Sequence, residues 1–167
     1  MLKIHGAGSR LLVLATLLLI LGACGTPAAT TPEHPESAAA GAKPAALVVY
    51  KSPTCSCCKD WNTHVMAYGF PVSVKEVDDV GAIKDRYAVP AALRSCHTAI
   101  VDGYVIEGHV PAADIERLLR ERPAIAGLAV AGMPIGSPGM EVPGAQPVAY
   151  DVIAFDAAGG TSVFASH

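Results

Sequence analysis

The sequence has few charged and few aromatic residues. Asp, Glu, Lys and Arg make up 16% of the 167 residues, Phe, Trp and Tyr only 5%, and the formal net charge is −3. Nucleic-acid-binding proteins carry a basic surface, so a chain with 15 acidic and 12 basic residues is not expected to bind nucleic acid. Long runs of like charge are also missing, which excludes an acidic or basic tail.

The chain also lacks an apolar run long enough for a stable membrane-spanning helix. The main apolar segment, Leu11–Leu21, has eleven residues, which extend about 16 Å as a helix against roughly 30 Å of bilayer hydrocarbon. Two basic residues, Lys3 and Arg10, precede this segment, and small residues follow it. This layout is typical of a secretory signal, so we expect residues 1–23 to be a signal peptide.

The end of the apolar segment resembles a bacterial lipobox, in which cleavage precedes a cysteine that becomes lipid-modified. Here Leu21-Gly22-Ala23 is followed by Cys24. The resemblance implies an extracytoplasmic lipoprotein anchored through Cys24 to a membrane on the periplasmic side. A plain signal peptide and a soluble periplasmic protein are the alternative. Residues 24–46 are predicted to be the lipidated cysteine and a flexible tether, because they are rich in Ala, Thr, Pro, Ser and Glu without apolar periodicity.

The folded domain is expected over residues 47–167. Apolar runs predict strands, and helix-forming segments bounded by Gly or Pro predict helices. Asp102-Gly103 between two apolar runs is typical of a hairpin turn. In chain order we expect strand 47–50, helix 59–68, strand 72–77, helix 80–87, strands 98–101 and 104–107, and helix 111–121. This order predicts an α/β fold. A Gly- and Pro-rich segment (132–144) and a terminal hairpin of residues 150–155 and 161–165 are expected to follow the last helix.

Three cysteines, Cys55, Cys57 and Cys58, lie between a predicted strand and the first turn of a predicted helix. Free N–H groups and the positive end of the helix dipole favour thiolates there. Cys55 and Cys58 have the C-x-x-C spacing of redox pairs, and Cys57 adds a third sulfur. One local disulfide cannot satisfy three thiols, so either one cysteine pairs elsewhere or the set binds a metal. Two structural disulfides are the simplest alternative without a metal.

Cys96 is the natural fourth sulfur because it immediately precedes the third predicted strand. In a thioredoxin-like order, which we expect for this single domain with its C-terminal extension and hairpin, that loop faces the redox cysteines. Thioredoxins place a cis-proline followed by threonine there, whereas residues 95–98 (SCHT) have His97 in place of the proline. Cys58-Lys59 matches the Cys-Lys that opens the thioredoxin active-site helix. The missing proline leaves room for ligands and weakens the case for a general disulfide oxidoreductase.

Four sulfurs favour a soft metal. Zinc sites usually have two separated pairs of cysteines, whereas thiolates with nearby thioethers and imidazoles suit Cu(I) better. The further candidate ligands are His97, His109 in the loop before the last core helix, and Met133 and Met140 in the Gly- and Pro-rich segment. The alternatives are a structural hydrogen bond for His97 and core filling for the methionines.

The predicted helix 59–68 carries two other side chains that bear on the site. His64 is expected to be solvated, and Trp61 is expected to pack beneath the helix. Neither is counted among the candidate ligands.

Four motifs together closely resemble the CopG-like family of bacterial metal-binding proteins, which are extracytoplasmic copper-resistance proteins. They are residues 50–61 (YKSPTCSCCKDW), 95–99 (SCHTA), 104–111 (YVIEGHVP) and 132–141 (GMPIGSPGME). The resemblance covers roughly residues 47–167. It implies a thioredoxin-like domain that binds copper at Cys55, Cys57, Cys58 and Cys96, with His97, His109, Met133 and Met140 as weaker additions.

These observations lead to one main hypothesis and two alternatives. The main one is a lipid-anchored, extracytoplasmic protein that sequesters Cu(I) or handles copper redox chemistry, with copper ions, other periplasmic copper proteins or a redox partner as its partners. The first alternative is a thiol–disulfide oxidoreductase with Cys55 as nucleophile and Cys58 as resolving residue. The second is a non-catalytic surface protein stapled by disulfides. Cys57 discriminates between them, because a two-cysteine redox enzyme does not need it.

Overall fold

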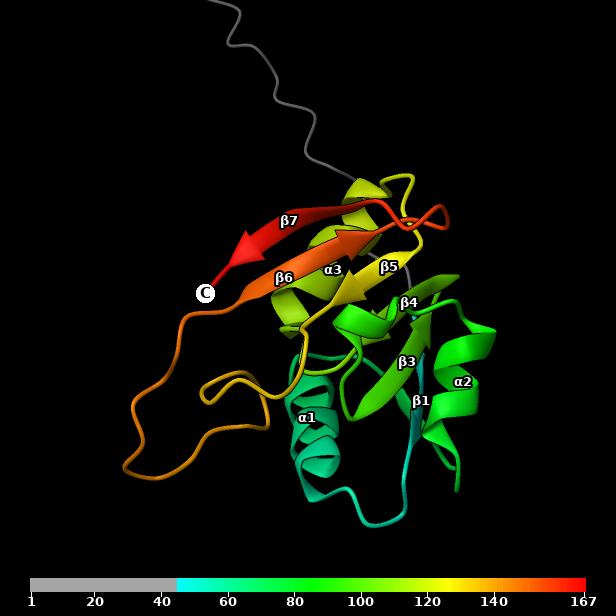
Figure 1. The fold of residues 1–167 in the computed structure, drawn as a ribbon. Helices are drawn as coiled ribbons and strands as arrows, with labels where there is room; N and C mark the ends of the chain where they lie inside the picture. The colour runs from blue at the N-terminus through cyan, green and yellow to red at the C-terminus, as the bar shows by residue number, and fades with distance from the viewer. Residues whose placement is uncertain (1–44) are drawn as a thin grey trace, which may run out of the picture. The chain divides into compact units, whose positions relative to one another are not determined.

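The computed structural model describes residues 45–167, so the predicted signal peptide, Cys24 and nearly all of the predicted tether lie outside the described residues. Within residues 45–167, no helix is long and apolar enough to cross a membrane. The strands of this part form one sheet with the order β2-β1-β3-β4-β5-β6-β7 (Figure 1). They are β1 Leu47–Lys51, β2 Val72–Glu76, β3 His97–Val101, β4 Tyr104–Glu107, β5 Gly127–Ala129, β6 Asp151–Phe155 and β7 Thr161–Ser166.

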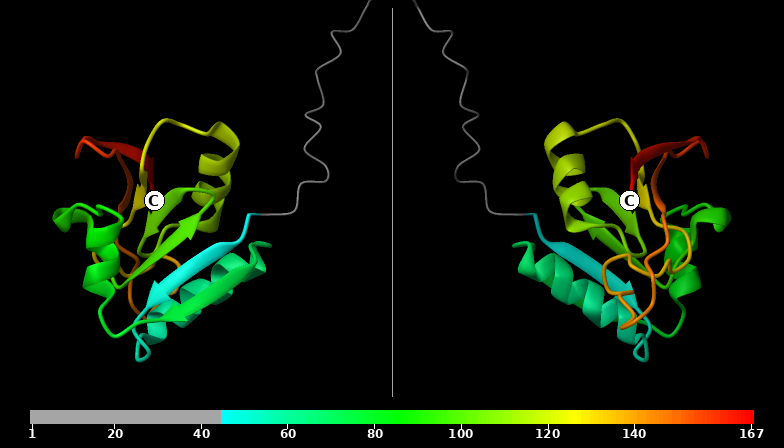
Figure 2. Two further views of the ribbon diagram at one scale, coloured as in Figure 1. Left: turned by 90° about the vertical axis from the view of Figure 1, so that its right-hand side faces the viewer. Right: turned by 90° about the vertical axis from the view of Figure 1, so that its left-hand side faces the viewer.

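The sheet is mixed and carries helices on both faces. Strand β1 pairs parallel with β2 and antiparallel with β3, β3 pairs antiparallel with β4, and β4 pairs parallel with β5. Helices α1 and α3 cover one face of the sheet, and α2 covers the other (Figure 2). The helices are α1 Ser56–Ala67, α2 Val80–Arg86, the short 3-10 helix η1 Ala91–Leu93, and α3 Ala112–Glu121.

The predicted α/β class and the predicted order of elements are confirmed as β1, α1, β2, α2, β3, β4 and α3, and the terminal hairpin is present as β6 and β7. The thioredoxin-like assignment stays a prediction from this order. The predicted start of the first helix at Lys59 is wrong, because α1 begins at Ser56 and includes Cys57 and Cys58. Serine and cysteine are weaker helix formers than lysine, so composition alone places the start too late.

Strand β5 is not revealed by the sequence pattern, because three residues are too short to show a period. It pairs with β4 on one side and β6 on the other. The terminal hairpin therefore continues the main sheet and is not an appendage beside it. The loop between β5 and β6 contains the Gly- and Pro-rich segment.

Three loops reach the same edge of the sheet. Strands β3 and β4 form the predicted hairpin around Asp102-Gly103, whose φ values of 48° and 88° suit a primed two-residue turn. Because the hairpin is antiparallel, β3 begins at the edge where β4 ends, so Cys96 and His109 lie at that edge. Strand β1 is antiparallel to β3 and ends there too. The topology thus brings Cys55, Cys96 and His109 to one place.

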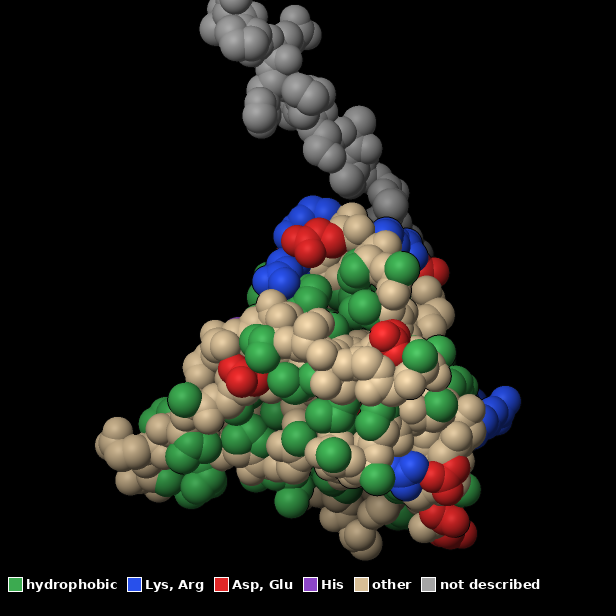
Figure 3. Space-filling model, turned by 45° about the horizontal axis from the view of Figure 1, so that its top comes forward, with side chains coloured by type: hydrophobic (Ala, Val, Ile, Leu, Met, Phe, Trp, Pro, Cys, Tyr) green, Lys and Arg blue, Asp and Glu red, His purple; other side chains and the backbone are tan. Residues whose placement is uncertain are grey.

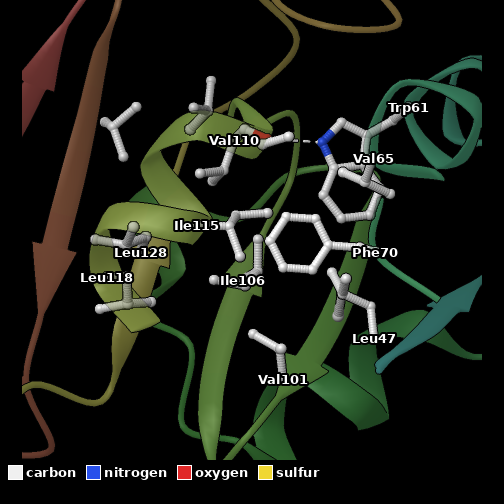
Figure 4. Packing of buried hydrophobic residues seen from close by; sticks show 14 of the residues in the cluster. Leu47, Trp61, Val65, Phe70, Val101, Ile106, Val110, Ile115, Leu118 and Leu128 are labelled. Atoms are coloured by element: carbon white, nitrogen blue, oxygen red, sulfur yellow. Dashed lines mark hydrogen bonds between the residues drawn. The ribbon is translucent and has the colours of Figure 1, made fainter. Parts of the chain in front are cut away.

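The apolar core lies between the sheet and the helices α1 and α3 (Figure 4). Trp61 of α1 is fully buried, as predicted, and its indole N–H donates a 2.9 Å hydrogen bond to the carbonyl oxygen of Val110. A buried indole N–H needs such a partner. This bond fixes α1, which carries two of the cysteines, against the loop that carries His109.

Candidate metal centre

Helix α1 begins among the clustered cysteines. Cys55 occupies the position before the helix with an extended backbone (φ −71°, ψ 102°), and Cys57 and Cys58 lie in the first turn. This turn contains no acidic residue. The positive end of the helix dipole therefore lies at the cysteines, with no acidic residue in the first turn to oppose it.

The four predicted cysteine ligands converge. Their Sγ atoms all lie within 4.8 Å of one another. The Sγ atom of Cys96 is 3.8 Å from that of Cys57 and 3.6 Å from that of Cys58, and the Sγ atoms of Cys57 and Cys55 are 3.6 Å apart. The structure thus brings together the sulfurs that the chain order placed near one another, while their role as ligands stays a prediction.

Cys55 and Cys58 form a disulfide, with their Cα atoms 5.4 Å apart. Cys57 and Cys96 are the free cysteines among the described residues. The alternative of two structural disulfides is therefore not the arrangement found in residues 45–167. The C-x-x-C pair is oxidised, and two thiols stand beside it.

A second group of candidate ligands shares Cys96 with the first. It consists of Cys96, His97 and His109, whose ligand atoms also lie within 4.8 Å of one another. The Sγ atom of Cys96 is 3.0 Å from Nε2 of His109 and 3.3 Å from Nδ1 of His97. Both histidines singled out in the sequence therefore contact the thiol on which the two groups meet.

His109 is held in the tautomer that suits a metal ligand. Its Nδ1 lies 2.8 Å from the carbonyl oxygen of Pro138, and because a carbonyl only accepts, Nδ1 carries the proton. The lone pair of Nε2 then faces Cys96. Burial lowers the pKa of His109, against an opposing effect of the Pro138 hydrogen bond. A neutral imidazole with one nitrogen fixed by a backbone carbonyl is the usual form of a metal-binding histidine.

His97 is fully buried between two aromatic neighbours. Its ring centroid is 4.5 Å from that of Trp61 and 5.1 Å from that of His109. Burial, helped by His109 and by the positive charge of Lys84, lowers the pKa of His97 well below its ordinary value, so the ring is neutral. Among residues 45–167 its Nε2 has no hydrogen-bond partner. The other ring nitrogen, Nδ1, contacts the Sγ atom of Cys96.

Cys96 is a protonated thiol in the metal-free protein. Burial raises its pKa to about 12, and the neighbouring Cys57 acts in the same direction. A metal ion that binds this sulfur must therefore displace a proton.

Residues 132–140, which we call the covering segment, pack against both sides of the site. Near its start, the carbonyl oxygen of Gly132 accepts a hydrogen bond from Ser95 Oγ, next to Cys96 in the chain. Further on, the Pro138 carbonyl accepts the hydrogen bond from His109. The covering segment therefore links the loop before β3 to the loop after β4.

The covering segment also touches helix α1 through Gly139. A Cβ atom at this position would lie 2.6 Å from the backbone nitrogen of Trp61 and 2.8 Å from the carbonyl oxygen of Cys57. Gly139 also has a φ of 81°, which residues with a side chain adopt at a cost. Only glycine allows the segment to lie this close to the helix turn that bears the cysteines.

The two candidate methionines differ in exposure. The side chain of Met133 is 52% exposed, so core filling is wrong for this residue, whereas Met140 is half-buried. Their role as ligands stays a prediction.

Figure 3 shows apolar side chains over much of one face of the molecule, with Lys and Arg next to Asp and Glu. Ile135 of the covering segment is among the exposed apolar residues.

Comparison with known proteins places this site in a family. Two solved structures, titled "Copper resistance protein copG- Form 2" and "Copper resistance protein copG- Form 1", match with TM-scores of 0.71 and 0.70. Each is 48% identical to this chain, and each match covers 74% of this chain and 98% of the solved chain. The chain belongs to the CopG-like family of copper-resistance proteins. A family model described as "Protein of unknown function, DUF411" matches residues 93–140. No curated protein matches.

Sequence reasoning misses two contacts of this CopG-like site. His64 is half-buried, not solvated as expected, and its Nε2 accepts a 3.1 Å hydrogen bond from the backbone N–H of Ala112. It joins α1 to the first turn of α3. The Pro138 carbonyl that orients His109 is missed because nothing in the side-chain sequence marks a backbone acceptor 29 residues away. The glycines of the covering segment are the only feature of the sequence that indicates a close approach of this segment to the helix.

Proposed function

We propose that this CopG-like protein binds Cu(I) outside the cytoplasm and either sequesters it or handles copper redox chemistry in copper resistance. The observation that carries the proposal is the convergence of four sulfur atoms within 4.8 Å, with the nitrogens of two histidines beside one of them. The solved relatives are titled copper resistance proteins, which supports copper as the metal. Thiolates and imidazoles are ligands that suit Cu(I).

The proposed ligand set depends on the state of the disulfide. In the oxidised form, Cys57, Cys96 and the two histidines provide the donors. When the Cys55–Cys58 disulfide takes up two electrons and two protons, two further thiols become available, and Cu(I) replaces their protons on binding. In redox handling, oxidation of two Cu(I) ions to Cu(II) would supply those two electrons. Met133 and Met140 are proposed as weaker thioether ligands.

Reduction of the disulfide should raise the amount of Cu(I) that the protein binds tightly. We expect the titration of the reduced protein under nitrogen, with a chromophoric Cu(I) chelator as competitor, to reach a higher stoichiometry than that of the oxidised protein. The matched control is the Cys55→Ser/Cys58→Ser variant, in which treatment with reductant should change nothing. Equal stoichiometry for the reduced and oxidised wild-type protein would contradict a site that uses all four sulfurs.

A thiol–disulfide oxidoreductase is the second candidate, and the observed Cys55–Cys58 disulfide favours it. In this mechanism a thiolate at Cys55 attacks a substrate disulfide, and Cys58 resolves the mixed disulfide. Two observations favour copper binding over it. Cys57 and Cys96 are not needed for exchange, and the covering segment packs at Gly139 against the helix turn beside the cysteines. Fast reduction of a protein disulfide together with negligible Cu(I) affinity would reverse this ranking.

The proposed location rests on the N-terminal sequence. We propose that residues 1–23 are removed as a signal peptide, and that Cys24 is lipidated and holds the domain at a membrane through the tether of residues 25–46. Other periplasmic copper proteins or a redox partner would then exchange copper or electrons with it. Free cysteines outside the cytoplasm tend to oxidise unless a metal or a reductant holds them, which suits a copper-loaded cluster.

The Cys24→Ser variant should lose membrane association. A single acyl chain binds a membrane only reversibly, and lipoprotein processing attaches more than one, so the wild-type protein should stay in the membrane fraction. The variant should be found in soluble form or with its signal uncleaved, as judged by fractionation and mass spectrometry. Wild-type protein that is wholly soluble and cleaved at another residue would refute the anchor.

A further inference from the structure

A buried carboxylate lies beneath the loop that carries Cys96. Glu107, the last residue of β4, is fully buried. Its Oε1 accepts hydrogen bonds of 2.6 Å from the backbone N–H of Ser95 and from Nζ of Lys84. Its Oε2 accepts one of 2.7 Å from the hydroxyl of Thr98. Lys84 also donates to that hydroxyl at 3.1 Å, which closes a ring of hydrogen bonds.

The two oxygens of Glu107 bind residues on either side of the candidate ligands. Ser95 immediately precedes Cys96, and Thr98 immediately follows His97. A single carboxylate therefore holds both ends of a four-residue stretch whose two middle members contact each other at 3.3 Å. No other side chain among residues 45–167 accepts hydrogen bonds from both of these ends.

After Glu107, strand β4 continues into the loop that carries His109. The backbone N–H of Gly108 donates a 3.0 Å hydrogen bond to the carbonyl oxygen of His97. A Cβ atom at Gly108, whose φ is 70°, would lie 2.5 Å from Cβ of Ser95. The two loops are thus in direct contact, and His109 follows immediately. A shift of Glu107 would move the loops of Cys96 and His109 together.

Stability alone is a weak reason for this ion pair. The side chains of Lys84 and Glu107 are 7% and 0% exposed, and the desolvation of two such charges offsets much of their attraction. Apolar residues of similar volume often stabilise a core as well or better. What a buried, fully hydrogen-bonded carboxylate does supply is a fixed position for each of its donors.

We propose that Glu107 is a positioning residue of the copper site, which holds the Cys96–His97 pair against His109, with Lys84 as its buried counter-ion. The copper readout of this proposal rests on the proposed function. A second readout uses the metal-free protein, so the positioning role of Glu107 and the proposed copper function can fail separately.

The Glu107→Gln substitution tests the proposal directly. Glutamine keeps one oxygen for the Ser95 N–H but presents an N–H₂ group that cannot accept the hydrogen bond from Thr98. We expect the Cu(I) affinity of the reduced protein to fall about 10- to 100-fold, as when other groups that orient metal ligands are removed. In a Cys96→Ser background the same substitution should have little further effect, because coupled residues are not additive. Equal losses in both backgrounds would overturn the proposal.

Alkylation of the reduced, metal-free protein gives the second readout. With iodoacetamide, Cys96 should react faster relative to Cys57 in Glu107→Gln than in the wild type, because its loop is released. The Lys84→Met/Glu107→Gln variant removes both charges and leaves no unpaired lysine. It should show the same rise in the alkylation of Cys96 relative to Cys57, and it serves as the test where the single variant folds poorly. Glu76→Gln is the matched control, since Glu76 pairs with the buried Lys51 on the neighbouring strand pair and does not contact the site.

The outcomes separate the two hypotheses. An unchanged Cys96 to Cys57 alkylation ratio in both Glu107 variants would overturn the positioning role, as would a Glu76→Gln effect of equal size. A wild-type protein that binds no Cu(I) would overturn the proposed function, and the alkylation ratio would still decide whether Glu107 positions Cys96.

Discussion

Replacing Cys96 with serine is expected to lower the Cu(I) affinity of the reduced protein by more than about 100-fold, beyond the loss that an orienting group causes. Cys96 is the one described residue that belongs to both groups of candidate ligands. Its Sγ lies 3.6 Å from that of Cys58 and 3.0 Å from Nε2 of His109. Serine has almost the same shape, but its hydroxyl is not a soft ligand. The substitution therefore removes the sulfur with little change in packing.

The same variant should change the pH dependence of binding. With a pKa of about 12, the Cys96 thiol is protonated between about pH 6 and 9, so each Cu(I) ion that binds this sulfur releases its proton. The wild-type affinity should rise with pH, and in Cys96→Ser the slope of log affinity against pH should fall by about one unit. Competition titrations under nitrogen at several pH values measure both effects.

Two further variants make this test specific. Ser56→Ala changes an exposed residue of the helix turn that carries Cys57 and Cys58, and it should leave the affinity unchanged. Cys57→Ser removes the other free thiol, which belongs to the first group only, and should cost less than Cys96→Ser. Unchanged affinity in both cysteine variants would rule out the four-sulfur site.

The Gly139→Ala substitution is expected to destabilise the domain by about 2–5 kcal/mol. A residue with a side chain at a left-handed φ costs about 1–2 kcal/mol, and forcing atoms into a packed contact costs typically 1–3 kcal/mol more. At this position the new Cβ would meet the backbone of Cys57 and Trp61 at 2.8 and 2.6 Å. Neither backbone atom can move without disturbing the first turns of α1. Denaturant unfolding of the metal-free protein measures the loss.

Gly144→Ala is the matched control for this prediction. Gly144 has the same φ of 81°, but a Cβ atom there would meet nothing within 4 Å. It should therefore show only the cost of the backbone conformation, about 1–2 kcal/mol. If the two variants lost equal stability, the covering segment would not be packed on α1 as described. The difference between them isolates the contact from the strain.

The N-terminal end of α1 shows what local sequence patterns predict about this site and what they do not. Three cysteines within the four residues 55–58, before good helix formers, predict sulfurs at a helix start, and Cys55 does precede the helix. The exact start at Ser56 was not predictable, because weak helix formers extend a helix only when its other turns are packed. Trp61, buried and hydrogen-bonded to the His109 loop, supplies that packing.

The sequence by itself determined the α/β order of elements, the Asp102-Gly103 hairpin and the sulfur-rich helix start, because hydrophobic period, turn chemistry and helix propensity act over a few neighbouring residues. The tertiary structure decided which groups meet. Cys96 reaches Cys57 across 39 residues of chain, and the carbonyl that sets the tautomer of His109 comes from a loop 29 residues later. Glu107 reads from the sequence as the polar end of a strand. Its role beneath Cys96 arises only when sheet pairing and the packing of α2 bury it beside Lys84, because a contact between distant residues depends on the whole fold.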